Sequence, residues 1–340
     1  MKRAKIAPAI LFLSAAFSLS FLGCDQSGGK PRIGVALLNF NDGIVGTARR
    51  ALETEAQGKA ALAVLDGRSQ QKLQNDQVDA LVIDKAKSII VNPVDPSALA
   101  SLAIKARSAG ISVVFFTRDP SMPPVDRWYK AYFVGAKAEE IDALQVEILA
   151  DYWKAHPDMD KNRDGRLQYA VIRGDSASEA SQADDEIRHK AFEAVRIKAV
   201  KVADALDEWT RAEAPQQMAA LIDSFGSKKP EALLCASDEI ALDAIEALKA
   251  AGYFKDSGGS FIPVIGADGA RGALDAISDG SLLGTVRVDA ASQGRAAFDL
   301  AYALAMGRDP GAAGWALVDS RFVFVPCAKV TRDNLKDFPD

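Results

Sequence analysis

The sequence predicts an α/β protein made of two Rossmann-like lobes, each built on a sheet of mostly parallel strands. From Arg32 onward, short β-branched runs such as RIGVALLNF and SIIVNPV alternate with helical patterns such as IVGTARRALETEA and PSALASLAIKARSAG. This βαβ alternation is typical of a parallel sheet that is covered by helices on both faces. The alternation restarts later in the chain, and 340 residues, 49% of them apolar, are enough for two hydrophobic cores.

Each lobe is expected to contain about five or six strands, which fits the length of the chain. The first set comprises RIGVALLNF, AALAVLD, SIIVNPV and SVVFFTR. The second set comprises YKAYFVGA, LQYAVIRG, KAVKVAD, ALLCASD, FIPVIGAD and LLGTVRVD. We predict that the chain crosses between the lobes near Ser112, Asp289 and Val325, so that the crossings form a three-segment hinge. Lobe 1 then takes residues 32–111 and 289–324, and lobe 2 takes residues 112–288 and 325–340.

The amino terminus has the features of an export signal. Residues 1–23 combine the basic start MKRAK with an apolar stretch, and they end directly before Cys24. The segment SFLGC resembles the cleavage box of bacterial lipoproteins, which implies lipidation of Cys24 and makes residues 24–31 a tether. We therefore expect a periplasmic or cell-envelope protein that a lipid holds at a bacterial membrane. A plain signal peptide with an incidental cysteine, or an uncleaved helix, remains an alternative.

The composition excludes several classes of function. The formal net charge of -5 comes from interspersed charges of both signs, so no basic face is available to bind nucleic acid. Cys235 and Cys327 lie in apolar runs and are expected to be buried free thiols. The two histidines, His156 and His189, fit neither a nucleophile pattern nor a zinc pattern, so we do not expect an enzyme.

Polar residues stand at the ends of several predicted strands, namely Asp42, Asn92, Asp238 and Asp268. In open α/β sheets, ligands bind at the carboxyl ends of the strands, where loops and helix N-termini converge. Two such sheets facing each other would form a cleft. For each residue taken singly, capping of the following helix explains its presence equally well. The repetition of the pattern is what favours a binding site.

The segment DKNRDGRLQ has the spacing of a calcium loop. Side-chain oxygens stand at the first, third, fifth and ninth positions, with glycine at the sixth and a main-chain carbonyl at the seventh. The twelfth position is Val171 instead of the usual glutamate, so a carboxylate from elsewhere would have to complete the site. Mg²⁺ is less suitable because it prefers few protein ligands and several waters. A solvated turn remains the alternative. The expected loop ligands are Asp160, Asn162, Asp164, the Arg166 carbonyl and Gln168.

From about Arg32 to Phe338, the chain resembles the periplasmic galactose/glucose-binding proteins, whose fold is of the periplasmic-binding-protein type. The same calcium-like loop stands there between a long helix and the first strand of the second lobe. Further matches are QNDQVDALVIDKAKSIIVNPVDP, YKAYFVGA, DEWTRAEAPQQM and LLGTVRVD. The resemblance implies a structural Ca²⁺ whose remote bidentate ligand is Glu231, in KKPEALLC.

The resemblance also implies a monosaccharide site. Charged carboxylate and guanidinium groups bond strongly to hydroxyls, and a tryptophan offers an apolar plane to the sugar ring. The Asp184 and Arg188 match requires four residues inserted after RGD. The positions that match the family pattern are Asp42, Asn92, Asp184, Arg188, Trp209 and Asp268.

Four positions depart from the family pattern. Ile44 replaces an aromatic residue, Gln182 replaces a histidine, and Ser237 and Val288 replace asparagines. Gln182 and Ser237 can still hydrogen-bond to a ligand, whereas Val288 cannot. The departures leave the identity of the sugar open.

The resemblance implies a monomeric solute-binding protein that captures D-glucose or D-galactose by hinge closure and delivers the sugar to an ABC-type permease. A chemoreceptor is a further expected partner. One alternative is a binder of a pentose or of a furanosyl signalling sugar. Another is a glycoside-acting enzyme that uses carboxylates among Asp42, Asp184 and Asp268. A related DNA-binding regulator would need a helix-turn-helix where the export signal stands.

Overall fold

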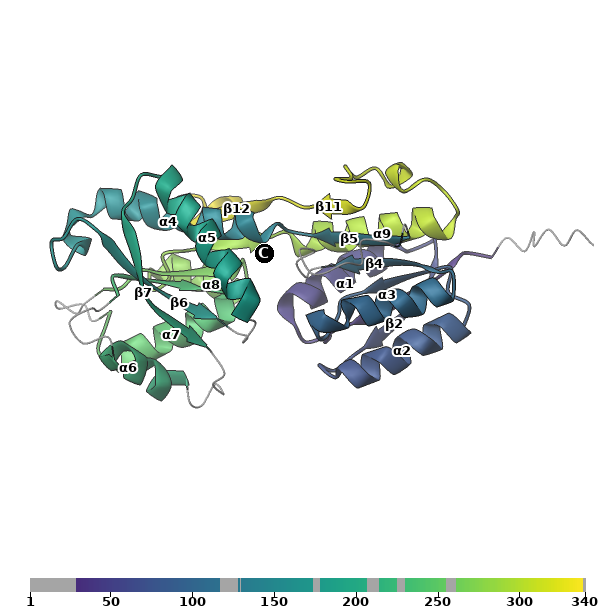
Figure 1. Ribbon diagram of the computed structural model, residues 1–340, viewed down its shortest axis with the longest axis horizontal. Coiled ribbons are helices and arrows are strands. Elements are labelled where there is room, and N and C mark those ends of the chain that lie inside the picture. The colour runs from purple at the N-terminus through teal and green to yellow at the C-terminus, as the bar shows by residue number, and fades with distance from the viewer. Residues whose placement is uncertain are drawn as a thin grey trace, which may run out of the picture. The chain divides into compact units, whose positions relative to one another are not determined.

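The computed structural model describes residues 29–116, 128, 130–173, 178–206, 214–224, 230–254 and 261–338. Within them the chain forms two six-stranded sheets, and both belong to the compact unit Pro31–Asp340 (Figure 1). The predicted α/β class and the predicted number of strands in each sheet are confirmed. The predicted export signal, Cys24 and most of the predicted tether lie outside the described residues.

The first lobe is built on the sheet with strand order β11-β5-β4-β3-β1-β2, whose neighbouring strands are all parallel. Helices α1 and α9 pack on one face of this sheet, and α2 and α3 pack on the other. The middle strands β3, β4 and β5 are buried at every residue, which explains their continuous apolar runs. The strands are β1 Arg32–Leu37, β2 Ala61–Asp66, β3 Ser88–Val91, β4 Ser112–Phe116, β5 Ala131–Gly135 and β11 Phe322–Phe324. The helices are α1 Gly43–Glu55, α2 Gln71–Ile83, α3 Leu99–Ser108 and α9 Ala290–Ala305.

The second lobe is built on the sheet with strand order β12-β10-β9-β8-β6-β7, in which only the β10 and β12 pair is antiparallel. Helices α6, α7 and α8 contribute to the core on one face, and α4 and α5 contribute to the core on the other. The strands are β6 Leu167–Arg173, β7 Ala199–Leu206, β8 Ala232–Cys235, β9 Val264–Asp268, β10 Gly284–Val288 and β12 Cys327–Thr331. The helices are α4 Ala138–Ala155, α5 Ser178–Ala194, α6 Ala214–Ser224, α7 Asp238–Ala250 and α8 Arg271–Asp279. Short 3₁₀ helices cover Pro96–Ala98, Pro157–Met159, Pro310–Ala313 and Leu335–Asp337.

The predicted first crossing near Ser112 is wrong. Strand β4 pairs with β3, and β5 pairs with β4 through Val113 and Ala131, so both strands belong to the first sheet. The chain leaves the first lobe only after Gly135, and α4 begins the second lobe at Ala138. The other two crossings stand where they were predicted, since Asp289 lies between β10 and α9 and Val325 lies between β11 and β12.

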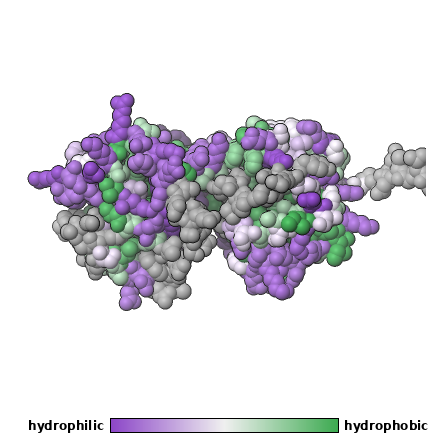
Figure 2. Space-filling model, viewed as in Figure 1, coloured by the Kyte–Doolittle hydropathy of each residue, from purple (hydrophilic) through white to green (hydrophobic). Residues whose placement is uncertain are grey.

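The coloured residues on the face seen in Figure 2 are mostly hydrophilic. Large apolar side chains with high exposure are few among the described residues, and the most exposed are Ile83 at 77% and Ile104 at 60%. No helix in this part of the chain is both long and apolar enough to cross a membrane. Cys235 is buried as predicted and Cys327 is half-buried, and neither forms a disulfide bond in the described part of the chain.

Candidate functional site

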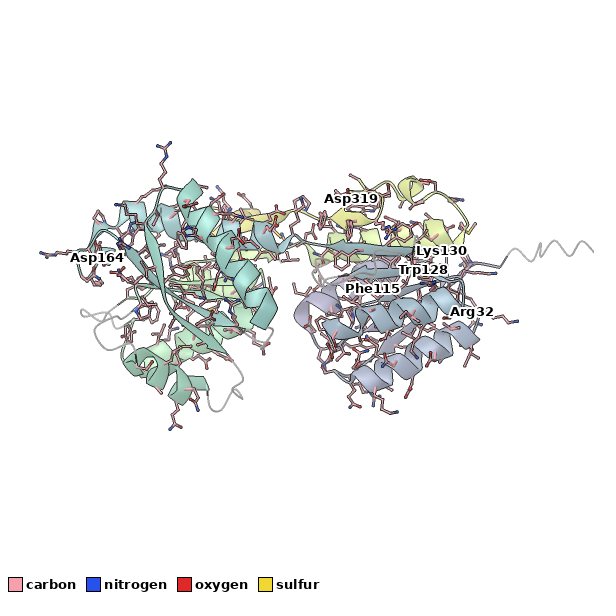
Figure 3. All side chains as sticks on the ribbon, viewed as in Figure 1. Arg32, Phe115, Trp128, Lys130, Asp164 and Asp319 are labelled. Carbon is pink, nitrogen blue, oxygen red and sulfur yellow. The ribbon has the colours of Figure 1, made fainter. Side chains whose placement is uncertain are left out.

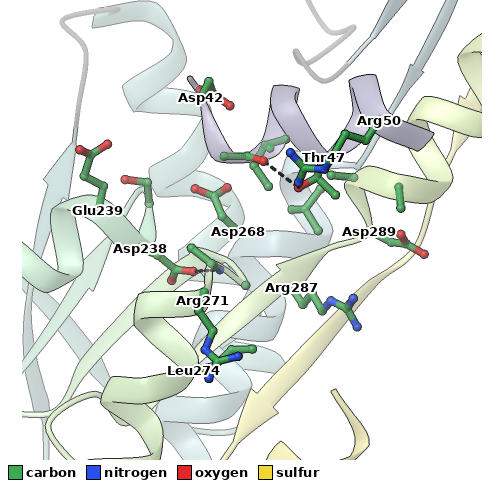
Figure 4. A pocket seen from close by; sticks show the side chains of 18 residues that line it. Asp42, Thr47, Arg50, Asp238, Glu239, Asp268, Arg271, Leu274, Arg287 and Asp289 are labelled. Atoms are coloured by element: carbon green, nitrogen blue, oxygen red, sulfur yellow. Dashed lines mark hydrogen bonds between the residues drawn. The ribbon is translucent and has the colours of Figure 1, made fainter. Parts of the chain in front are cut away.

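A cavity of about 770 Å³ is lined by residues of both lobes (Figure 4). Four helices begin at its wall, and the residues that cap their N-termini are Asp42, Ser237, Ala270 and Asp289. Strands β8, β9 and β10 end beside these helix starts. The N-terminus of a helix presents free N–H groups and a positive dipole, which favour oxygen-rich ligands. The cavity therefore lies at the predicted carboxyl-terminal edge of the second sheet.

Three of the predicted binding residues line this cavity, namely Asp42, Ser237 and Asp268. One carboxylate oxygen of Asp42 accepts a hydrogen bond from the Val45 N–H at 2.8 Å. The Ser237 hydroxyl accepts one from the Ile240 N–H at 3.3 Å. Both residues cap helices and also line the cavity. Helix capping and a place in a binding site, the two explanations left open by the sequence, are therefore compatible.

Asn92 is not among the residues that line the cavity. Its side chain is only 1% exposed and connects three strand ends of the first lobe. The amide oxygen accepts a hydrogen bond from the Leu38 N–H at 3.3 Å, and the amide nitrogen donates one to the Phe116 carbonyl at 3.1 Å. Asn92 therefore holds β1, β3 and β4 in register where the sheet meets its loops.

Arg188 is not among the described residues that line the cavity, and its expected place beside a ligand stays a prediction. It stands ten residues after the start of α5 at Ser178, which is about 15 Å along the helix axis. Its guanidinium is 7% exposed and pairs with Asp142 of α4 at 2.9 Å. A buried ion pair of this kind fixes how two helices pack, because either charge left alone would be costly. The side chains of Gln182, Asp184 and Trp209 lie outside the described residues.

Asp238 stands at a strand end and lines the cavity, but it is not among the predicted site residues. It is fully buried beside Asp268, at 0% exposure. One of its carboxylate oxygens accepts a hydrogen bond from the Ala270 N–H at 2.6 Å, and the other accepts one from the Thr285 hydroxyl at 2.6 Å. Burial raises the pKa of Asp238 to about 6, against the hydrogen bonds that lower it. The sequence feature that could have identified Asp238 is its position directly after the helix-capping serine in CASDE.

Asp268 is the most perturbed carboxyl group of the cavity. Burial, together with the nearby charges of Asp238 and Asp42, raises the pKa of Asp268 to about 8. Its backbone φ of 113° lies in a region that side-chain-bearing residues rarely adopt. Strained backbone at a cavity wall is a common property of ligand sites.

Three arginines that are not among the predicted site residues also line the cavity. Arg50 donates a hydrogen bond to the Thr47 hydroxyl at 3.0 Å, and Arg271 donates one to Asp275 at 3.1 Å. The Arg287 guanidinium lies 5.3 Å from the centre of the Phe338 ring. Each cation therefore has a partner within its own lobe, while the acidic groups Asp42, Asp268 and Glu239 gather on another side of the cavity (Figure 4).

We expect Asp268→Asn to raise the Tm of the ligand-free protein at pH 8 by several degrees. In the unfolded chain Asp268 ionises near its ordinary pKa of 3.8, but in the folded protein it keeps its proton up to about pH 8. The unfolded state therefore binds fewer protons between these values, and stability falls as pH rises through this window. The amide of asparagine does not ionise, so the variant avoids this loss of stability. Its gain in Tm should therefore be large at pH 8 and small at pH 4. Thermal melts at pH 4, 6 and 8 measure it, with Asp275→Asn on the exposed surface of α8 as the control. An equal gain at pH 4 and pH 8 would contradict the assignment.

The predicted calcium loop brings its oxygens together in front of β6 (Figure 3, Asp164). Asp160 accepts hydrogen bonds from the Asp164 N–H at 3.1 Å and the Gly165 N–H at 2.9 Å. The Gln168 amide donates to Asp164 at 2.9 Å. The backbone turns sharply through positive φ angles of 59° at Arg163 and 71° at Gly165. Asn162 completes the set by accepting a hydrogen bond from the Asp164 N–H at 3.0 Å.

Glu231 faces this loop from the start of β8, as the resemblance implied. Its carboxylate oxygens accept hydrogen bonds from the Lys161 N–H at 2.7 Å and the Gln168 N–H at 3.0 Å. Burial, and then repulsion from Asp160 and Asp164, raises the pKa of Glu231. In the described part of the chain, no three His, Cys, Asp or Glu side chains form a metal site by themselves. Amide and main-chain oxygens would therefore have to supply part of any coordination.

The chain matches the model of the periplasmic binding protein domain over residues 33–309. It is 34% identical to the D-galactose/methyl-galactoside-binding periplasmic protein of Haemophilus influenzae, over 90% of this chain and 91% of that protein. A solute-binding protein of an ABC transporter from Bacillus halodurans, solved with bound myo-inositol, is similar with a TM-score of 0.74 and 25% identity. The match covers 92% of this chain and 98% of that one. The myo-inositol-binding protein of Caulobacter gives a TM-score of 0.71 at 25% identity, over 91% of this chain and 96% of that one.

Proposed function

Because this chain belongs to the periplasmic binding protein family, we propose that it captures D-galactose or D-glucose in the cavity lined by both lobes. The chain is a sugar-binding periplasmic component of an ABC transporter, and it is a transport protein, not an enzyme. The resemblance to galactose/glucose-binding proteins that the sequence predicted is confirmed. The observation that carries the choice of a hexose is the 34% identity to a galactose-binding relative along nearly the whole chain.

The chemistry of the cavity supports a polyhydroxylated ligand. Asp42 comes from the first lobe, and Asp268 comes from the second. Carboxylate oxygens accept strong hydrogen bonds from hydroxyl groups, and a sugar offers several hydroxyls at fixed angles. A ligand that bonds to both side chains is more stable in a closed form of the protein than in an open one, so binding would drive hinge closure. The volume of about 770 Å³ lies within the range of small-molecule sites.

A cyclitol such as myo-inositol is the second candidate. The described residues that line the cavity include aliphatic side chains such as Ile44, Leu274 and Val288, but no aromatic side chain. An aromatic plane favours a pyranose, whose ring has a face of C–H groups. A cyclitol that carries a hydroxyl on every ring carbon depends less on such a plane. Two similar structures at 25% identity hold or bind myo-inositol.

A panel of ligands tests the proposal on the purified protein. We expect D-galactose or D-glucose to give the largest rise in Tm and a calorimetric Kd in the micromolar range or below, because hydrogen bonds to charged groups fix every hydroxyl they reach. The panel also contains myo-inositol, D-ribose, D-xylose and L-arabinose. A larger shift with myo-inositol would establish the cyclitol instead, and a pentose that exceeds both would support the alternative noted from the sequence. No shift with any of these ligands would contradict the proposal.

The location and partners of the protein extend the proposal. The family implies a periplasmic protein, and we propose that it is exported by residues 1–23 and anchored through a lipid on Cys24. The basic start, the apolar stretch and the segment SFLGC support this processing. We further propose that the monomeric, sugar-bound form docks on an ABC-type permease and on a chemoreceptor.

We also propose a structural Ca²⁺ in the loop Asp160–Gln168. Seven or so oxygen ligands suit Ca²⁺, and the loop with Glu231 offers carboxylate, amide and main-chain oxygens. The residues that would hold the ion are Asp160, Asn162, Asp164, Arg166 through its carbonyl, Gln168 and Glu231. When bound, the ion would neutralise carboxylates that repel one another, which is the repulsion that raises the pKa of Glu231 after burial.

A further inference from the structure

Asp238 occupies an unusual position for a buried carboxylate, because nothing in its contacts is a cation. It is the first residue of α7 and is 0% exposed. Its two oxygens bond instead to the Ala270 N–H and the Thr285 hydroxyl, each at 2.6 Å. A buried carboxylate that accepts hydrogen bonds only from neutral donors lowers the stability of the folded protein. Its presence therefore has to be explained by the role of those donors.

The Ala270 N–H belongs to the turn that carries Asp268 into the cavity. Asp268 has a φ of 113° and Gly269 a φ of 76°, so two consecutive residues adopt positive φ. Positive φ at a residue with a side chain persists only when surrounding contacts impose it. The backbone N–H of Asp238 also bonds to the Asp268 carboxylate. Asp238 therefore contacts this turn twice, through its side chain and through its backbone.

Two neighbouring glycines, Gly266 and Gly269, allow the close packing around Asp238, because a larger residue at either position would clash. A Cβ on Gly266 of β9 would lie 2.2 Å from a carboxylate oxygen of Asp238, so only glycine allows the carboxylate to reach its place. A Cβ on Gly269 would lie 2.6 Å from Arg287 Cγ and 3.0 Å from its Cα, so the turn is pressed against β10. The carboxylate, the turn and the strands β9 and β10 form one closely packed unit.

We propose that Asp238 is a positioning residue, whose carboxylate holds the strained turn at Asp268 and Gly269 so that the Asp268 side chain faces the bound ligand. This inference rests on the proposed ligand site and deepens it. Asp238 also lines the cavity, but each of its oxygens already accepts a hydrogen bond from the protein, and these two bonds are the ones that position the turn. The Thr285 hydroxyl on β10 holds the Asp238 carboxylate in place. The carboxylate in turn holds the turn through its hydrogen bond from the Ala270 N–H.

Two variants separate positioning from simple stabilisation. Asp238→Ala removes both hydrogen bonds, and we expect it to weaken sugar binding about tenfold or more. Thr285→Val removes only the hydroxyl contact and leaves the Ala270 bond, so we expect a lower Tm but a Kd within about twofold of the original. Asp238→Asn keeps an oxygen for the Ala270 N–H, and it should restore most of the affinity that alanine loses. Calorimetry with the ligand found for the unaltered protein measures all three variants.

If Asp238→Ala does not fold, Ala270→Pro serves instead. Ala270 has a φ of -66°, which proline can adopt, so the substitution removes the N–H and places the ring Cδ against the Asp238 carboxylate. Unchanged affinity in Asp238→Ala or in Ala270→Pro would overturn the inference. An equal affinity loss in Thr285→Val and Asp238→Ala would also overturn it, because the turn would then have no special role.

A measurement without any ligand keeps this inference distinct from the proposed function. Hydrogen exchange at the Ala270 amide should be at least tenfold faster in Asp238→Ala, which loses the Ala270 bond, than in Asp238→Asn and Thr285→Val, which keep it. Fast exchange in the unaltered protein would overturn the inference even if sugar binds. If exchange is slow in the unaltered protein but no sugar in the panel binds, the proposed function is contradicted. The inference that Asp238 holds the turn would still stand.

Discussion

Replacing Asp268 by alanine is expected to weaken monosaccharide binding about 100-fold. The side chain lines the cavity at the end of β9, where a ligand hydroxyl would bond to it. A hydrogen bond to the carboxyl group contributes about 0.5–1.5 kcal/mol, and a ligand hydroxyl that is left unpaired when the group is removed costs about 1–3 kcal/mol. Because 1.4 kcal/mol corresponds to tenfold in Kd, about 100-fold lies inside this range. Titration calorimetry of the variant with its best ligand measures the change.

The matched control for this result is Asp275→Ala. Asp275 is also an aspartate of the second lobe, but it lies on the exposed side of α8, where it pairs with Arg271. Exposed ion pairs contribute at most about 1 kcal/mol to stability, and Asp275 is not among the residues that line the cavity. Its Kd should stay within about twofold of the original. Equal affinity in Asp268→Ala and Asp275→Ala would place the ligand elsewhere in the protein.

Removing Ca²⁺ is expected to lower the Tm substantially while leaving the sugar Kd within about threefold. An ion that binds only the folded state stabilises it by an amount that grows with its concentration over Kd, about 4 kcal/mol at a thousandfold excess. The loop lies before β6, whereas the cavity lies at the carboxyl ends of its neighbours. Strand β6 has seven residues, so about 20 Å separate its two ends. Thermal melts with excess chelator and with restored Ca²⁺ measure the shift.

Glu231→Gln gives this result a control that does not depend on a chelator. The variant keeps the shape of the side chain, but it removes the negative charge and leaves one oxygen to accept from the Lys161 and Gln168 N–H groups. It should melt at a lower temperature than the unaltered protein in Ca²⁺, and chelator should shift it much less. A chelator effect of the same size in Glu231→Gln would show that the metal binds elsewhere. A large loss of sugar affinity in the chelated, folded protein would contradict the separation of the two sites.

The strands and helices could be predicted from the sequence, because buried parallel strands have continuous apolar runs that alternate with helical patterns. The sequence was not sufficient to assign every strand to a sheet. SVVFF and AYFVG have the same local pattern as strands of either lobe, and only the pairing of Val113 with Ala131 decides their place. That pairing joins segments that local periodicity cannot connect. The first crossing was therefore placed too early, while the crossings at Asp289 and Val325 stand at clear changes of pattern.

The binding residues were predictable where a single junction of strand and helix decides their position. Asp42, Ser237 and Asp268 stand at such junctions, and all three line the cavity. Arg188 was selected from a motif match, which says nothing of its partner Asp142 on another element, and its place beside a ligand stays a prediction. Asp238 was passed over as a site residue because its partners, Ala270 and Thr285, lie far away in the sequence.

The order of the segments in the first lobe bears on how the protein is made. Its core contains Ala296, Phe298 and Leu300 of α9, which pack with Ile33 and Leu52 from near the start of the chain. A domain emerging from the ribosome completes its core only when all of its segments are available. The amino-terminal lobe therefore stays incomplete until nearly the whole polypeptide has been synthesised. For a periplasmic protein, this order delays completion of the amino-terminal lobe during most of its synthesis.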